Sequence, residues 1–440
     1  MGAGKTTIAR TLGLPVVETD ASVPIELFAQ GEHVFRAREE QVVREMLERN
    51  DPVVVDLGGG AVTSERTRAL LRERATVVWI DADVDTCWER VAGSDRPLAQ
   101  NRADFERLYS ERRVLYEEVA DVRARDADDV ALAAAGIVVA NGALQKLGDY
   151  VDGPVALVSD PNVAGIHGMD AQLALGQRLQ EMHELPAGEE AKTLAALDRL
   201  WQDLRLDRTG TLVALGGGCT TDAAGFAAAT YLRGIDWVPV PTSLVGQVDA
   251  AIGGKTAIDL PQGKNLVGAF HWPARTVIDP LLLDTLPEKE RREGMSEVVK
   301  TSLLAGENLH DPLDVRRCAA FKAAICLRDP HDHGERKRLN LGHTFAHALE
   351  TAAQYEGVTH GQAVALGLKA ALKLSGEDTR LVDELLQPKP VRVDRDAAWA
   401  AMRRDKKTVG GELRLVLLRE WDVPVPEHDV RAALDELIAG

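Results

Sequence analysis

Two histidines and one glutamate in the last third of the sequence could together bind a metal ion. Glu297 lies in the apolar segment MSEVVKTSLL, His343 lies in NLGHTFAH, and His360 follows in VTHGQAV. Such a His₂Glu set is typical of catalytic zinc sites, which keep one coordination position open. His343 and His347 form an alternative pair, because histidines four residues apart on a helix can also chelate zinc. The sequence therefore predicts a Zn²⁺ or Co²⁺ site that includes His343.

Polar side chains recur at helical spacing around the first of these histidines. Arg336, Asn340, His343 and His347 are separated by four, three and four residues, so one continuous helix would present them on a single face. The residues between them are largely apolar. A polar stripe on an otherwise apolar helix indicates a lined site rather than a surface that faces solvent.

Glu297 and Lys300 are predicted to share one face of another helix. They are three residues apart, and Thr285 with Glu288 offers a capping box at the start of that helix. An exposed ion pair is the ordinary interpretation of this spacing. The apolar neighbours of both residues, together with the polar stripe that follows, favour a place in the metal-containing site instead.

A strand followed by glycines predicts a dinucleotide site. Residues 212–215 are apolar and run into GGGCTTD, after which a helix of small residues begins. A glycine turn at a helix N-terminus can bind the pyrophosphate of a dinucleotide. Further along, charged residues lie in glycine-rich, apolar sequence that is unlike a solvated surface. These segments supply Asp249, Lys255, Lys264 and Asn265, and their lysines are predicted ligands of a substrate phosphate and carboxylate.

The opening residues, MGAGKTT, match the end of a phosphate-binding loop for ATP–Mg²⁺. Gly2 and Gly4 would cradle phosphates, Lys5 would reach the β and γ oxygens, and Thr6, followed by Thr7, would ligate Mg²⁺. A flexible glycine-rich terminus is the alternative interpretation. The first glycine of the motif and the strand that normally aims it are missing, so we expect weak kinase activity without that central strand.

The sequence that follows resembles shikimate kinase. The resemblance rests on the phosphate loop, Asp20, FRAREE, VDLGGG, DRPLA and SERRVLY, in that order. It implies that Asp20, Lys5 and Arg96 act in phosphoryl transfer, Arg96 from a lid over the phosphates. A lone arginine is more often a solvated surface charge. Here, the planar guanidinium groups would suit the carboxylate of shikimate. The residues implied to bind shikimate are Asp20, Arg36, Gly58, Gly59, Gly60 and Arg112. Glu18 departs from the aspartate that the family usually has near Mg²⁺.

From about Leu144 to its end the chain resembles 3-dehydroquinate synthase, so the whole chain resembles a fusion of the two families. The resemblance implies that Glu297, His343 and His360 bind the metal ion. The implied catalytic residues are Asp249, Lys255, Lys300 and His347. The implied NAD contacts are Asp160, Glu189, Lys192, Gly216, Gly217, Gly218, Asp222, Thr242, Ser243, Lys264 and Thr285. The implied substrate contacts are Asn265, Lys322, Arg336, Asn340, Lys407 and, from the neighbouring subunit of a homodimer, Arg233.

The resemblance also implies a redox-neutral reaction. NAD oxidises a ring hydroxyl to a ketone, which acidifies the neighbouring C–H bond so that phosphate can leave. The ketone is then reduced again, and the ring opens and recloses as a carbocycle. The metal ion polarises the transient carbonyl, and NAD is not consumed.

The elements that must position these residues alternate between strands and helices. Apolar runs at 53–57, 77–80, 155–158, 212–215, 237–240 and 276–278 predict buried strands of a parallel α/β fold. After about residue 279 helical spacing dominates until 413–418. We therefore expect three domains: a P-loop kinase-like parallel sheet without its first strand over residues 1–130, an α/β NAD-binding domain over 131–280, and a mainly helical metal- and substrate-binding domain over 281–440.

Composition restricts the partners and the compartment. The chain has 440 residues, of which 45% are hydrophobic and 28% charged, and its net charge is −17. This charge disfavours nucleic acid and anionic membranes as partners. The four cysteines show no CxxC spacing, and no apolar run approaches the roughly 18 residues of a membrane span. We expect a cytoplasmic protein.

Two alternatives remain open at this point. A metal-dependent polyol dehydrogenase on the same fold would share the glycine turn and the metal ligands, but it would have no use for Lys255, Lys264 and Lys300. The N-terminal third could also be a docking module without activity. The synthase part departs from its family in shortened segments after Lys300 and Leu374 and in Pro330, which stands where an acidic residue is usual.

Overall fold

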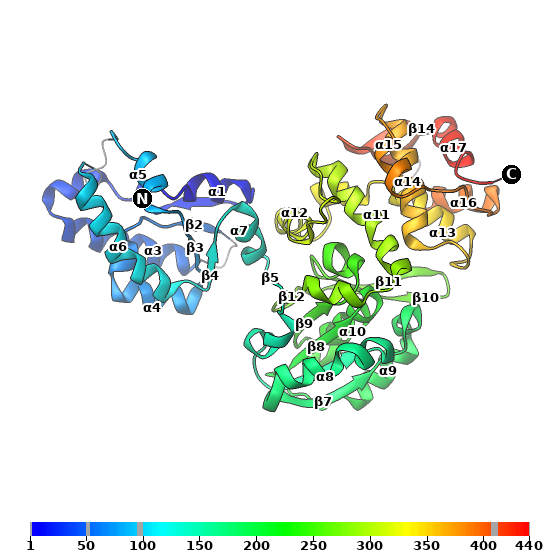
Figure 1. The fold of residues 1–440 in the computed structure, drawn as a ribbon, viewed down its shortest axis with the longest axis horizontal. Coiled ribbons are helices and arrows are strands. Elements are labelled where there is room, and N and C mark those ends of the chain that lie inside the picture. Colours follow the sequence, from blue (N-terminus) through cyan, green and yellow to red (C-terminus); the bar gives the residue numbers. More distant parts are fainter. Residues whose placement is uncertain (1, 50–52, 95–99, 406–411, 440) are drawn as a thin grey trace. The chain divides into compact units, whose positions relative to one another are not determined.

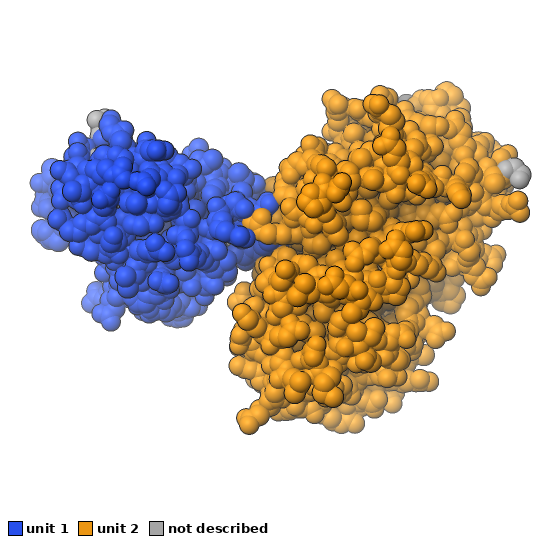
Figure 2. Space-filling view, in the orientation of Figure 1, with its two compact units in different colours: residues 1–135 blue, residues 136–440 orange. Residues whose placement is uncertain are grey.

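The computed structural model describes residues 2–49, 53–94, 100–405 and 412–439. The chain forms two compact units, residues 1–135 and 136–440 (Figures 1 and 2). The first unit ends at residue 135, and the domain boundary predicted after residue 130 stays a prediction. The further division of 136–440 at residue 280 stays a prediction. No helix among the described residues is both long enough and apolar enough to cross a membrane.

The first unit contains two pairs of parallel strands. β1 pairs with β2 and β3 pairs with β4, and among the described residues no strand joins the two pairs. Buried side chains of the helices pack around these strands in three small clusters. The parallel strand pairing predicted for this unit is thus confirmed. Its elements are α1 (Lys5–Thr11), β1 (Val16–Glu18), α2 (Thr19–Ser22), α3 (Glu32–Leu47), β2 (Val54–Asp56), α4 (Glu65–Arg74), β3 (Val78–Ile80), α5 (Val84–Glu89), α6 (Arg102–Val119), β4 (Val122–Ala124) and α7 (Ala127–Ala134).

The second unit begins with a parallel four-stranded sheet in the order β7-β6-β8-β9. Every residue of β6 and β8 is buried, as expected for strands covered on both faces. Alternate residues of these strands pack against α9 and α10 on one face and against α8 on the other. The elements are β5 (Ile137–Val139), β6 (Val155–Ser159), α8 (Pro161–Leu175), β7 (Leu179–Glu184), α9 (Leu194–Asp203), β8 (Thr211–Gly216), α10 (Gly218–Thr230) and β9 (Asp236–Pro241).

Three further strands lead from this sheet to the helices. β10 (Lys255–Leu260) and β11 (Gly263–Phe270) form an antiparallel hairpin, and β12 (Thr276–Ile278) pairs with β5 in parallel. Helix α10 lies close to this hairpin because it is built of small residues. A Cβ atom at Gly225 would lie 2.5 Å from Thr256 Cγ2 and 2.8 Å from Trp237.

The remainder of the unit is mainly helical and lies on the other side of the hairpin from the parallel sheet in Figure 1. Two buried apolar clusters hold it together. Helices α13 and α14 approach closely, since a Cβ atom at Gly367 would lie 2.0 Å from Gly342 O. The elements are α11 (Glu288–Ala305), α12 (Val315–Arg328), α13 (His343–Ala352), α14 (His360–Leu374), α15 (Arg380–Leu385), α16 (Arg395–Asp405), β13 (Glu412–Val416), β14 (Trp421–Pro426) and α17 (Glu427–Asp435).

Two local predictions are wrong. The polar stripe does not lie on one continuous helix, because residues 335–340 form a short 3₁₀ helix and α13 begins only at His343. Gly342 between them has a φ of 80°, the left-handed conformation that interrupts a helix. The capping box is also absent: Pro287 is the N-cap of α11, and the Thr285 hydroxyl donates instead to Leu282 O.

Candidate active sites

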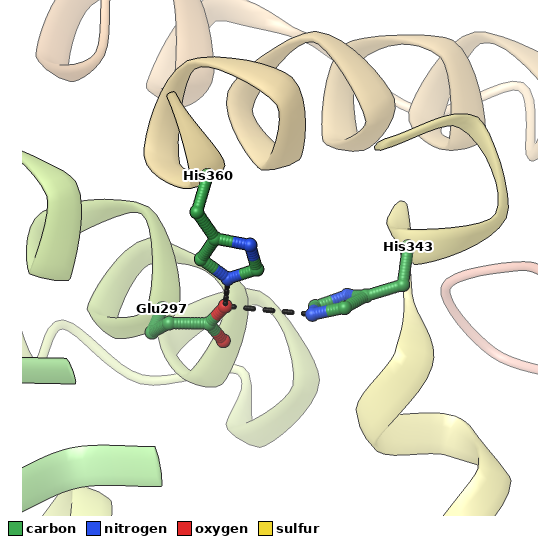
Figure 3. A group of neighbouring side chains, drawn as sticks. All are labelled: Glu297, His343 and His360. Atoms are coloured by element: carbon green, nitrogen blue, oxygen red, sulfur yellow. Dashed lines mark hydrogen bonds and ion pairs between the residues drawn. The ribbon is translucent and has the colours of Figure 1, made fainter. Parts of the chain in front are cut away.

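Glu297, His343 and His360 come together in the second unit. Their ligand atoms all lie within 4.8 Å of one another. His360 Nε2 lies 3.1 Å and His343 Nε2 lies 3.5 Å from the same oxygen, Glu297 Oε1 (Figure 3). Two neutral imidazoles and one carboxylate are donors suited to Zn²⁺ or Co²⁺, and three protein ligands leave a position for substrate. The residues present therefore fit the expected metal ion.

The three side chains come from three different helices. Glu297 lies in the buried middle of α11, His343 is the first residue of α13, and His360 is the first residue of α14. Thr359 caps α14 by accepting from Gln362 N, and Glu293 Oε2 accepts from Gly361 N at 2.5 Å. Both histidines therefore lie at helix starts whose position is set by tight packing and capping.

His347 does not belong to this group. Its ring lies 5.6 Å from the ring of His343, one turn further along α13. The geometry therefore supports the set of Glu297, His343 and His360 over the alternative pair of His343 with His347. It leaves His347 next to the metal ligands, where the family resemblance implies contact with substrate.

Buried charges extend from the metal ligands toward α12. Glu297 is 1% exposed and Lys300 is 2% exposed, so the exposed ion pair is excluded. Lys300 forms an ion pair with Glu297 and lies 3.4 Å from Asp249 Oδ1, and Lys322 Nζ lies 2.8 Å from the same oxygen. Burial would raise the pKa of Glu297, but Lys300 and His343 outweigh it and hold this pKa well below its ordinary value.

The same balance keeps the two cationic groups charged. Burial opposes the charge on Lys300, yet Asp249 and Glu297 raise its pKa. Burial also opposes the charge on His360, but hydrogen bonds to Glu297 and Glu350 raise its pKa to about 10. Metal binding at His360 would therefore displace a proton, because a histidine must be neutral at the nitrogen that binds a metal ion.

Asp249 lies in a π-helix, Gly246–Ala250, which is uncommon in proteins and often marks a functional site. Its backbone carbonyl accepts from Lys322 Nζ at 2.7 Å. Gln247 holds the same turn, because its fully buried amide donates to Pro241 O and Asp279 O. These contacts place the Asp249 carboxylate between two ammonium groups.

Lys255 and Arg336 approach from the hairpin and from the 3₁₀ helix. Arg336 is 2% exposed and donates to Gly253 O at 2.8 Å, which ties its loop to the start of β10. Lys255 Nζ lies 2.5 Å from Asp332 Oδ2. Sequence reasoning missed Asp332, although it follows Pro330 by two residues and supplies a carboxylate to this loop. An acidic residue between two histidines in HDH was the available signal.

The predicted dinucleotide residues meet at the carboxyl ends of β8 and β9. Gly216 ends β8, Gly217 caps α10, and Thr242 N donates to Gly216 O at 2.9 Å. Ser243 Oγ would lie 3.5 Å from a Cβ atom at Gly217, so both lie at the same turn. This edge of a parallel sheet, with a helix N-terminus behind it, is where dinucleotides bind in α/β folds.

A polar network continues this edge to the hairpin. Lys192 is 4% exposed; its ammonium lies 2.7 Å from Asp222 Oδ2 and also donates to Asn265 Oδ1. Asn265 has a φ of 57°, and its backbone N–H donates to Asp259 Oδ1 at 2.8 Å. Sequence reasoning missed Asp259, because its role depends on the hairpin geometry. Lys264 Nζ completes the network with Glu189 Oε1 at 2.5 Å.

The remaining predicted residues have varied positions. Asp160 caps α8 at the end of β6, and the Thr285 hydroxyl lies 2.8 Å from His167 Nε2 on that helix. Asn340 is half-buried at the end of the 3₁₀ helix, and Arg233 is exposed in a turn after α10. Lys407 and Arg96 lie outside the described residues.

In the first unit the phosphate loop contacts the end of β2. Lys5 Nζ lies 3.6 Å from Asp56 Oδ1, and the Thr6 hydroxyl donates to Asp56 Oδ2. Gly2 and Gly4 have φ values of 75° and 84°, so the loop uses backbone conformations that favour glycine. Thr7 is exposed on α1. Asp56 was not predicted, although a carboxylate at the end of a buried strand was visible in VDLGGG.

The predicted shikimate residues surround the glycine turn at residues 58–60, which follows β2. A Cβ atom at Gly58 would lie 2.2 Å from Asp20 Oδ1, and one at Gly60 would lie 2.2 Å from Arg36 Nη1. Gly59 is held between them by Tyr116, whose hydroxyl donates to Gly59 O at 2.6 Å. A larger residue at Gly58 or Gly60 would therefore displace Asp20 or Arg36, two of the residues predicted to bind shikimate.

Two buried polar atoms, one on Glu39 and one on Arg112, belong to this predicted shikimate site. Arg36 Nη1 donates to Glu39 Oε2 at 2.6 Å, while Glu39 Oε1 and Arg112 Nε are buried without a hydrogen-bond partner among the described residues. Burial would raise the pKa of Glu39 and does so despite the opposing effect of Arg36. Buried unpaired polar atoms are costly and mark places that a ligand can satisfy.

Comparison with known families covers both units. The shikimate kinase family model matches residues 1–140, and the models for the N-terminal and C-terminal parts of 3-dehydroquinate synthase match residues 182–293 and 294–408. The chain is similar to 3-dehydroquinate synthase of Rippkaea orientalis, with 37% identity over 323 residues, 64% of this chain and 88% of that protein.

Solved structures of two sugar-phosphate cyclases are also similar. One is 2-deoxy-scyllo-inosose synthase in complex with carbaglucose-6-phosphate, NAD⁺ and Co²⁺, with a TM-score of 0.60, 25% identity, and coverage of 68% of this chain and 96% of that chain. The other is 2-epi-5-epi-valiolone synthase of Streptomyces hygroscopicus with NAD⁺ and Zn²⁺, with a TM-score of 0.56, 26% identity, and coverage of 68% and 96%. These matches show that the chain belongs to the 3-dehydroquinate synthase family and carries a shikimate kinase domain at residues 1–140.

Proposed function

We propose that the second unit is a metal- and NAD-dependent 3-dehydroquinate synthase that converts 3-deoxy-arabino-heptulosonate 7-phosphate to 3-dehydroquinate and phosphate. The observation that carries this proposal is the convergence of Glu297, His343 and His360 beside the Lys300, Asp249 and Lys322 charges. A metal ion bound there would polarise a carbonyl, and NAD bound at the glycine turn would supply reversible oxidation of a ring hydroxyl.

The chain's own residues would position the substrate. The ammonium groups of Lys255, Lys300 and Lys322 and the guanidinium of Arg336 offer positive charge to a phosphate and a carboxylate, which a plain polyol lacks. His347 lies beside the metal ligands and would act there as a general acid or base that transfers protons to and from the substrate. The cations therefore favour a sugar-phosphate cyclase over a polyol dehydrogenase.

The proposed synthase reaction is tested by its stoichiometry. Purified protein with Zn²⁺, NAD⁺ and the heptulosonate phosphate should release one phosphate per substrate consumed, with no lasting increase in NADH absorbance. The physical reason is that the oxidised ring carbon is reduced again within the same turnover. NADH that accumulates in proportion to substrate would contradict the cyclase and favour a dehydrogenase.

We further propose that the first unit phosphorylates shikimate with ATP–Mg²⁺. Arg36→Ala should weaken shikimate binding about 10- to 100-fold, because a charge-assisted hydrogen bond to a carboxylate is worth about 1.5–3 kcal/mol. Arg38→Ala on the same helix is the matched control, since Arg38 is paired with the exposed Glu45. Calorimetric titration with shikimate, with ADP formation measured in parallel, separates a kinase from a docking module. Equal binding by both variants would contradict the assignment.

We also propose a homodimer in which Arg233 contacts the substrate of the neighbouring subunit. Support comes from its exposed position in a turn with a φ of 68°, which projects from the end of α10. Sedimentation should show a dimer, and Arg233→Ala should raise the KM for the phosphate substrate more than it lowers kcat. A fully active monomer would rule this out.

A further inference from the structure

The outer nitrogens of both metal-ligating histidines are held by protein groups. His343 Nδ1 lies 3.2 Å from Leu341 O, and His360 Nδ1 lies 3.5 Å from Glu350 Oε1. In each ring the other nitrogen, Nε2, faces Glu297 Oε1 (Figure 3). Metal-ligating histidines commonly donate their second N–H to a carboxylate or a carbonyl, which orients the ring. Each histidine here has such a partner, one neutral and one charged.

Glu350 is placed for this contact by its helix. It lies on α13 seven residues after His343, so both side chains project from the same face two turns apart. Glu350 is only 5% exposed, and a buried carboxylate is costly unless it accepts hydrogen bonds. Helix α13 therefore supplies one metal ligand directly and a carboxylate for the other.

His360 needs such a partner more than His343 does. The side chain of His360 is 38% exposed, against 12% for His343, so packing restricts its ring less. Glu293 holds only the backbone beside it, through Gly361 N. The carboxylate of Glu350 is the group that faces the outer nitrogen of the ring, Nδ1.

We propose that Glu350 is a positioning residue of the metal site. It accepts a hydrogen bond from His360 Nδ1–H, which selects the tautomer with its lone pair on Nε2 and aims that lone pair at the metal position. This inference rests on the proposed metal-dependent function. It assigns Glu350 no contact with substrate.

Metal affinity tests the inference without relying on turnover. Metal-free wild type, Glu350→Leu, Glu350→Gln and the neighbouring control Thr351→Ala would compete with a chromophoric chelator for Zn²⁺. Glu350→Leu fills the space without an acceptor and should bind Zn²⁺ about 10- to 100-fold more weakly. Glu350→Gln keeps an acceptor oxygen and should lose less. Thr351→Ala should match wild type, because the Thr351 hydroxyl pairs with the Tyr355 hydroxyl, which is not part of the metal site.

A second readout distinguishes positioning from general stability. The visible spectrum of the Co²⁺ form should change in Glu350→Leu, whereas a purely structural role would lower the melting temperature of the metal-free protein and leave the spectrum unchanged. Wild-type affinity and spectrum in Glu350→Leu would overturn the inference. If that variant does not fold, Glu350→Ala, which also lacks an acceptor, takes its place, and wild-type affinity and spectrum in Glu350→Ala would overturn the inference. Failure of wild type itself to bind Zn²⁺ or Co²⁺ would instead overturn the metal-dependent function, and this inference with it.

Discussion

Removal of the metal ion should abolish phosphate release from the heptulosonate phosphate, and Zn²⁺ or Co²⁺ should restore it in wild type. In His343→Ala the same additions should leave activity at least about a thousand-fold lower. A Lewis acid contributes several kcal/mol to the transition state, and each 1.36 kcal/mol is about tenfold in rate. His343 belongs to both candidate ligand sets, so its replacement removes a metal ligand under either assignment.

His347→Ala is the discriminating control for this prediction. It removes the neighbouring histidine of the same helix, which lies outside the group of three donors. Metal content measured after dialysis should stay near one per chain in His347→Ala and fall in His343→Ala and in Glu297→Gln. Full activity of the metal-free wild type, or loss of metal from His347→Ala alone, would contradict the proposed ligand set.

Replacement of Lys300 by methionine should destabilise the metal-free protein by about 3–5 kcal/mol, the usual cost of removing one partner from a buried ion pair. Lys300 is 2% exposed and neutralises Glu297, which is 1% exposed, while Asp249 keeps Lys322 as a second partner. A bound metal ion would supply positive charge to Glu297 in place of the ammonium. Saturating Zn²⁺ should therefore recover part of the lost stability.

Urea unfolding in the presence of a chelator and of Zn²⁺ measures both effects. Lys289→Met is the matched control, because Lys289 is exposed on the same helix, and its change should be small. If Lys300→Met unfolds at the same urea concentration as Lys289→Met, the buried charge network contributes nothing to stability.

Much of the fold could be predicted from the sequence because its signals are local. The apolar runs at 155–158 and 212–215 are strands buried on both faces, and they lie at the centre of the parallel sheet. The two glycine turns follow strands as expected. Short strands with less apolar sequence, such as β1, β4 and β7, escaped prediction because their burial depends on neighbours that periodicity does not reveal.

The chemistry of the candidate sites was also visible in residue types. The sequence predicts Glu297, His343 and His360 as a ligand set, because few other roles bring two histidines and a glutamate into apolar sequence. The prediction of one continuous helix from Arg336 to His347 failed at Gly342, whose left-handed conformation starts a new helix. Residue spacing predicts which side chains share a face if a helix is continuous. It does not show where a tightly packed glycine separates one helix from the next.

The partners of these residues were decided by the tertiary structure alone. Lys255 with Asp332, Asn265 with Asp259 and His360 with Glu350 join residues from separate elements. The sequence by itself determined which groups could carry charge, protons or a metal ion, because those are properties of single side chains. Which of them meet, and in which orientation, depends on the packing of α13 against α14 and of the hairpin against α10, where contacts between distant parts of the chain set the geometry.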